Sequence, residues 1–208
     1  MELGIEFEEQ LAGYFSLNAL NPEAGEQKGK SSNQHLVVHT RVTIEDLHRW
    51  LETRSCSGNL NGTVDFPPLG KHLPIQSGHI GLINTNDLLD IDLLIYEMNF
   101  RARGQDYFLT GKKQVSHDHC PDSWPDVMTV YAQLHEGNDR DAPITGAGIL
   151  KLELDDLFDM LSTITVMGTD SVPEKAIAIR QFGKLYLGEL WKTCSSFVGS
   201  GEVCGTSD

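Results

Sequence analysis

The chain has 208 residues, of which 39% are hydrophobic and 22% are charged, which is enough apolar material for one ordinary domain with its own core. Acidic residues outnumber basic residues by 30 to 16, and the resulting net charge of −14 argues against nucleic acid or an anionic membrane as a partner. The N-terminal segment carries several glutamates and no long apolar run. We therefore expect no signal peptide, no membrane span and a cytoplasmic location.

Alternating hydrophobicity predicts a mostly β fold with about eight antiparallel strands, arranged as a barrel or a sandwich. The predicted strands are residues 6–17, 36–44, 59–66, 74–83, 93–103, 107–117, 128–135 and 144–154. Residues 18–33 are polar and rich in Gly, Lys, Glu and Ser, so we expect a mobile loop there. A short helix is predicted at 45–51, directly after the second strand.

Helical spacing replaces the strand pattern in two later segments, 155–161 and 174–191. The longer segment has an apolar stripe that we expect to pack on the core rather than to bind a ligand. The stripe consists of Ala176, Ile179, Phe182, Tyr186 and Leu190. These patterns predict a single β domain over residues 1–193 with a packed C-terminal helix, followed by a flexible Gly/Ser-rich tail over 194–208.

Three charged residues, Glu9, Lys113 and Asp126, occupy strand positions where the alternation calls for apolar side chains. Because successive side chains of a strand point to opposite faces, these three should point the same way as their apolar neighbours. Lys113 could form a buried ion pair with Glu9 or Asp126, or a strand edge or bulge could turn one of them to water. Alternatively, all three line a cavity as candidate catalytic residues, because a desolvated lysine beside a carboxylate can act as an acid–base pair.

Metal and cofactor signatures are weak. The run His117-Asp118-His119-Cys120 contains only potential ligands, but adjacent residues of an extended segment point to opposite sides. The four cysteines lack zinc-like spacing, and the sequence contains no nucleotide-binding or hydrolase fingerprint. We therefore expect neither a metal nor a cofactor.

A series of short motifs resembles the accessory domain attached to cholesterol-oxidase-like flavoproteins of the glucose–methanol–choline class, and sometimes to patatin-like or α/β-hydrolase domains. The motifs are Phe7-x-Glu9-x-Leu11-x-Gly13, Gly62-Thr63-Val64, Gly78-x-Ile80-x-Leu82, Tyr96-x-Met98-x-Phe100, Tyr107-x-Leu109-x-Gly111-x-Lys113, Trp124-Pro125-Asp126, Thr129-Val130-Tyr131 and Gly146-x-Gly148-Ile149-Leu150, followed by the segment 182–191. The resemblance implies an accessory role in lipid or sterol chemistry without flavin binding. The sequence departs from the family at Met128, where a second Thr is expected, and we expect it to stand alone, without an attached enzyme.

These observations favour a β-barrel with a cavity for an apolar small molecule such as a sterol, a terpenoid, a polyketide or a fatty acyl chain. The aromatic residues expected to line that cavity are Phe7, Phe15, Tyr96, Phe100, Tyr107, Trp124 and Tyr131. They could equally fill a closed core. Two alternatives stay open: a cofactor-independent cyclase or isomerase acting on such a ligand, and a non-catalytic module that docks on an oxidoreductase or hydrolase.

Overall fold

The computed structural model describes residues 2–53, 57–86, 91–116 and 128–187. The strands are β1 (Gly4–Leu17), β2 (His35–Ile44), β3 (Ser57–Phe66), β4 (Gly70–Asn86), β5 (Ile91–Ala102), β6 (Gln105–Ser116), β7 (Thr129–His135), β8 (Ile144–Lys151) and β9 (Thr165–Met167). The helices are α1 (Pro22–Ser32), α2 (Leu47–Thr53), α4 (Leu154–Thr163) and α5 (Val172–Leu187). None of these helices is long and apolar enough to span a bilayer.

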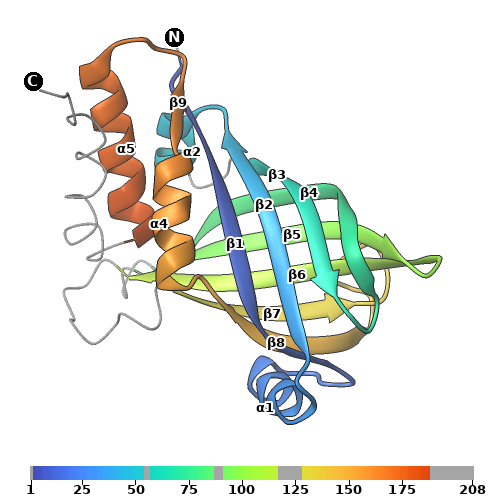
Figure 1. The fold of residues 1–208 in the computed structure, drawn as a ribbon. Coiled ribbons are helices and arrows are strands. Elements are labelled where there is room, and N and C mark those ends of the chain that lie inside the picture. Colours follow the sequence, from blue (N-terminus) through green and yellow to red (C-terminus); the bar gives the residue numbers. More distant parts are fainter. Residues whose placement is uncertain (1, 54–56, 87–90, 117–127, 188–208) are drawn as a thin grey trace, which may run out of the picture.

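Strands β1 to β8 form a closed antiparallel barrel (Figure 1). Each strand pairs with the next in the sequence, and β1 closes the ring by pairing with both β2 and β8. The predicted mostly β fold, with a short helix after the second strand and a C-terminal helix, is confirmed. Of the two predicted architectures, the barrel is the one that forms, and its closure leaves few exposed strand edges.

Strand β1 changes partners along one edge. The opposite edge pairs with β2 over most of its length, whereas this edge pairs with β8 only from Ala12 onward and with the short strand β9 at residues 4–6. On this edge, residues 7–11 pair with no strand in the described part of the chain, and we call this stretch the seam. Helix α4 covers the seam, where the Glu8 backbone N–H donates to Thr163 Oγ1 at 2.9 Å.

The loop prediction for residues 18–33 is wrong, because helix α1 occupies most of that segment. The helix has standard end signals. The Asn21 side chain accepts a hydrogen bond from the first turn, and Asn33 ends the helix in the left-handed conformation with φ of 50°. The segment has no apolar stripe, which is why its composition resembled that of a loop.

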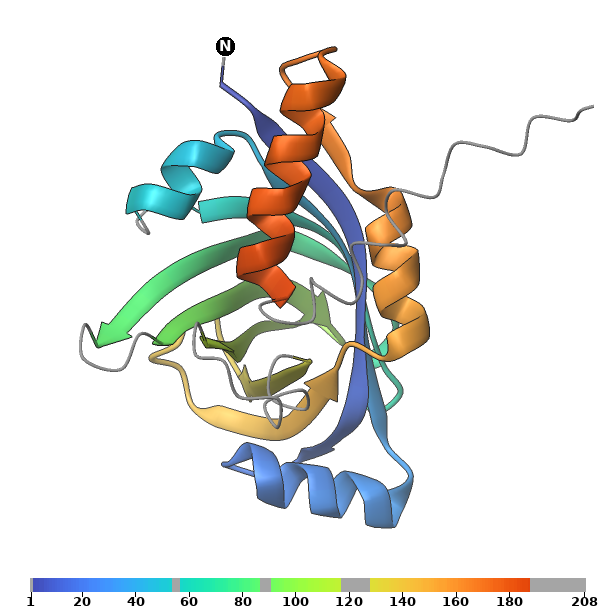
Figure 2. The same ribbon diagram turned by 90° about the vertical axis from the view of Figure 1, so that its left-hand side faces the viewer.

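Helix α1 packs on the outside of β1 and β8 through glycines (Figure 2). A Cβ atom at Gly25 would lie 1.9 Å from the carbonyl oxygen of Ala147, and one at Gly29 would lie 2.6 Å from the backbone nitrogen of Phe15. The two backbones therefore approach more closely than any larger side chain would allow.

Helix α5 lies across the end of the barrel that faces the viewer in Figure 2. The predicted inward direction of Phe182 and Tyr186 is confirmed, because both are buried and Phe182 packs on Phe7 of β1 with ring centroids 4.9 Å apart. Ala176 is exposed, so the stripe does not extend to the start of the helix as predicted, and Leu190 lies outside the described residues. Aromatic side chains of α5 thus fill this end of the barrel.

Candidate functional site

Four polar side chains converge inside the barrel beneath α5, and we call them the interior polar cluster. They are Glu9 of β1, Tyr96 of β5, Lys113 of β6 and Tyr186 of α5, each no more than 4% exposed. Strand alternation brings the first three inward, as expected from the sequence, and the helix contributes the fourth. The walls around them are apolar, and Glu9 follows the strand position that carries Phe7.

Hydrogen bonding in the cluster is concentrated on one oxygen of Glu9. The hydroxyl groups of Tyr186 and Tyr96 both donate to Glu9 Oε1, the latter at 3.3 Å. The two hydroxyl oxygens also lie 2.6 Å apart, but each hydroxyl has one proton, so a hydrogen bond between them replaces one of the two bonds to Glu9. The other carboxyl oxygen, Oε2, is buried and has no hydrogen-bond partner within the described part of the chain.

Lys113 Nζ is the second buried polar atom of the cluster for which the described residues provide no hydrogen-bond partner. It lies over the Tyr186 ring, 3.9 Å from the ring centroid, in a cation–π arrangement. The direct, hydrogen-bonded ion pair between Lys113 and Glu9 that the sequence allowed is not formed. The two groups nevertheless interact electrostatically.

Burial dominates the protonation of the cluster. It raises the pKa of Glu9, against the opposing effects of Lys113 and of the two tyrosine hydroxyls. Burial also lowers the pKa of Lys113 from its ordinary value of 10.5 to about 8, against the opposing effect of Glu9. The pKa values of Tyr96 and Tyr186 lie well above 10, because burial and the Glu9 carboxylate disfavour the phenolate. Burial therefore disfavours the charged form of both the lysine and the carboxyl group.

The remaining predicted site residues do not all join the cluster. Phe100 is buried further along β5 and stacks on the partly buried Tyr107, with ring centroids 5.7 Å apart. Tyr131 is 36% exposed, since it alternates with the inward residues of β7, so it lies outside the barrel wall. Trp124 and Asp126 lie outside the described residues.

Tyr186 is the member of the cluster that sequence reasoning missed. Its helical spacing marked it as core filler, and nothing in the local pattern indicated that its hydroxyl would meet a carboxyl group 177 residues away. The available signal was the pairing of a phenol on a predicted core face with charged residues on predicted inward strand positions.

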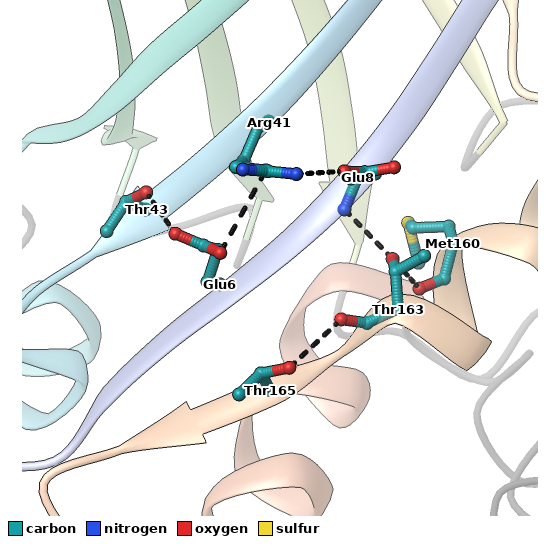
Figure 3. Close-up of polar contacts among 7 residues, drawn as sticks. All are labelled: Glu6, Glu8, Arg41, Thr43, Met160, Thr163 and Thr165. Atoms are coloured by element: carbon teal, nitrogen blue, oxygen red, sulfur yellow. Dashed lines mark hydrogen bonds and ion pairs between the residues drawn. The ribbon is translucent and has the colours of Figure 1, made fainter.

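A second polar region lies on the outside of the barrel wall, beside α4 (Figure 3). A groove of about 510 Å³ runs here between β1, β2, β3 and α4. Arg41 of β2 is one of the residues that line it, with Nη2 2.5 Å from Glu8 Oε1 and Nε 3.9 Å from Glu6 Oε1. All three side chains are more than one-third exposed, so water solvates these charges beside the place where α4 packs on the seam.

The fold and the cluster define the class of protein: an antiparallel β-barrel with a small polar group buried in an apolar interior. Comparison of the chain with protein-family models, with curated proteins and with solved structures gave no match. The resemblance to the accessory domain of cholesterol-oxidase-like flavoproteins and hydrolases therefore stays a prediction. Among the described residues, no three His, Cys, Asp or Glu side chains are grouped to hold a metal ion.

Proposed function

We propose that the barrel binds an apolar small molecule, such as a sterol, a terpenoid, a polyketide or a fatty acyl compound, through one oxygen-bearing group placed at the interior polar cluster. The observation that carries the proposal is that two buried polar atoms, Lys113 Nζ and Glu9 Oε2, have no hydrogen-bond partner among the described residues. Such a protein would serve as an accessory binding protein in lipid or secondary metabolism.

Unpartnered polar atoms are costly in a protein interior. Each buried donor or acceptor left without a hydrogen bond costs about 1–3 kcal/mol, and more where the group is charged. A ligand oxygen between Lys113 and Glu9 would accept a hydrogen bond from the ammonium group, and a ligand hydroxyl would also donate to the carboxylate. The surrounding apolar residues would contact the rest of the molecule.

The ligand must compete with α5 for space. The rings of Phe182 and Tyr186 stack with centroids 5.0 Å apart and fill the end of the barrel above Lys113. Binding therefore requires these rings to withdraw, with α5 moving outward as a unit or its side chains rotating. The hydrogen bonds that Tyr186 gives up to Glu9 would be replaced by bonds to the ligand.

The first test is native mass spectrometry of the purified chain, combined with a thermal-shift screen of sterols, terpenoids and fatty acids. A co-purified apolar molecule, or an increase of several degrees in Tm with one ligand class, is the expected result. The variant Lys113→Met should lose that increase, whereas Lys112→Met, which alters the exposed neighbour on the same strand, should keep it. An empty chain whose Tm responds to none of the ligands contradicts the proposal and favours a docking module for an oxidoreductase or hydrolase.

A second candidate function, a cofactor-independent cyclase or isomerase, is favoured by the opposed pKa shifts of Lys113 and Glu9. A general acid–base pair is most effective when its pKa values lie near the working pH. In that case Glu9→Gln should abolish turnover of the bound molecule while ligand-induced stabilisation persists. If the ligand binds and is recovered chemically unchanged, the cyclase or isomerase function is contradicted and only the binding function stands.

A further inference from the structure

Lys113 carries a nucleophilic nitrogen that the hydrogen bonds of the interior polar cluster leave unused. Its side chain is 1% exposed, and Nζ has no hydrogen-bond partner in the described part of the chain. Among the described residues no carboxylate contacts this group, and its burial removes it from solvent, so the charged ammonium form is poorly stabilised. The neutral amine, which is the form that attacks a carbonyl carbon, is favoured accordingly.

We propose that Lys113 forms an imine with an aldehyde or ketone group of the bound apolar molecule, an inference that rests on the proposed ligand-binding function. The surroundings supply the other groups that this chemistry needs. Glu9 provides a carboxyl group with a free oxygen, and the Tyr186 hydroxyl, which is hydrogen-bonded to Glu9, is attached to the ring beneath Lys113 Nζ. The apolar walls limit the water that would hydrolyse the product.

The reaction balances with the groups present. The nitrogen of neutral Lys113 forms a bond to the carbonyl carbon, and the proton that the nitrogen loses passes to the carbonyl oxygen. The carbon–oxygen bond of this carbinolamine then breaks, and the oxygen leaves as water after taking a proton from the Glu9 carboxyl group. The products are a protonated imine on Lys113, the Glu9 carboxylate and one molecule of water.

The protonation of the pair agrees with this sequence of steps. Burial lowers the pKa of Lys113 to about 8 and raises the pKa of Glu9, so both shifts favour the neutral amine and the neutral acid that these steps use. After the reaction the two charges reappear as the imine and its counter-ion, so the net charge of the interior does not change.

The test uses the full chain, incubated at pH 7.5 with an equimolar amount of decanal or citronellal in the presence of sodium cyanoborohydride, which reduces a protonated imine to a stable amine. Peptide mapping by mass spectrometry then locates the adduct. The expected result is one alkylated residue, Lys113, in the wild type and in Lys112→Met, and no interior adduct in Lys113→Met. The variant Lys113→Arg, which keeps the charge but not the nucleophile, should also lack the adduct if Lys113→Met folds poorly.

Decanol and citronellol separate this inference from the proposed function, because they resemble the aldehydes in shape but cannot form an imine. If the alcohols raise the Tm while the aldehydes leave Lys113 unmodified, the imine is overturned and ligand binding stands. If neither the alcohols nor the aldehydes act on the chain, both proposals fail. Labelling spread over exposed lysines without enrichment at Lys113 also overturns the imine.

Discussion

Glu8 and Glu9 are neighbours on β1, yet the barrel wall places them in opposite environments. The Glu8 carboxylate lies on the outside, exposed to water, in an ion pair of 2.5 Å with Arg41. The Glu9 carboxyl group lies inside, where it accepts hydrogen bonds from tyrosine hydroxyls and none of the described cations is hydrogen-bonded to it. Thus the outer glutamate makes the short contact with a cation, whereas burial raises the pKa of the inner glutamate.

The difference shows that the length of an ion pair does not indicate how much its residues contribute to the free energy of unfolding. On the outside, water already solvates both charges, so pairing them changes the free energy of unfolding little. Inside, no water replaces a missing partner, so each unpaired atom affects stability, protonation and ligand affinity. The interior polar cluster should therefore respond strongly to substitution, and the outer pair weakly.

The largest effect is expected for Glu9→Ala, which removes the acceptor of both tyrosine hydroxyls and the counter-charge of Lys113. The free energy of unfolding should fall by about 3 kcal/mol, as measured by urea denaturation. The matched substitution Glu8→Ala, one residue along the strand, should leave the urea midpoint nearly unchanged. Equal effects of the two substitutions would contradict the comparison between the inner and outer faces.

The next effect concerns pH. Because the pKa of Lys113 is about 8 in the folded chain and 10.5 ordinarily, the unfolded chain binds more protons between these values. The contribution of Lys113 to stability therefore rises with pH in this window, by about 2 kcal/mol between pH 7.5 and 9.5. Urea denaturation at the two pH values should show this rise relative to Lys113→Met, in which the contribution is absent.

The rise in stability with pH is limited to the range between about pH 8 and pH 10. The raised pKa values of Tyr96 and Tyr186 reverse the trend above about pH 10, where the unfolded tyrosines ionise and the folded ones do not. Below pH 8 the ammonium form is buried at a desolvation cost, so the stability of the wild type relative to Lys113→Met should be lower at pH 7 than at pH 9.5. A wild type that loses stability relative to Lys113→Met between pH 7.5 and 9.5 would show that Lys113 is not desolvated.

A smaller effect is expected for Tyr186→Phe, which removes the hydroxyl but keeps the ring over Lys113. The loss of its hydrogen bonds to Glu9 and Tyr96 should lower the free energy of unfolding by about 1–2 kcal/mol. The same substitution at the exposed Tyr131 serves as the control and should have no measurable effect. If Tyr186→Phe behaves like Tyr131→Phe, the hydroxyl does not anchor α5.

The smallest effect is expected for Arg41→Ala on the outer face. The urea midpoint should remain within the error of the measurement, and any residual difference should shrink as salt is added, because exposed charges are screened. A loss of stability comparable to that of Glu9→Ala would mean that the packing of α4 on the seam depends on Arg41.

Helices α5 and α1 show what local sequence patterns can and cannot predict, because the first was predicted and the second was not. The strong aromatic spacing of α5 predicted both the helix and the burial of Phe182 and Tyr186. Helix α1 was missed although Asn21 and Asn33 mark its ends, because it packs through glycine backbone rather than through an apolar stripe. A glycine in a contact helix has the same sequence signal as a glycine in a loop.

The sequence by itself determined the eight strands of the barrel but not the short strand β9, and it placed Glu9, Lys113 and Tyr96 on inward faces, because side-chain direction along a strand follows from its period of two. Only the tertiary structure decided that the sheet closes into a barrel through β1, that Tyr186 completes the cluster, and that Lys113 lies on an aromatic ring rather than against a carboxylate. Those outcomes depend on which residues distant in the chain meet at one end of the barrel. Local periodicity contains no information on that distance.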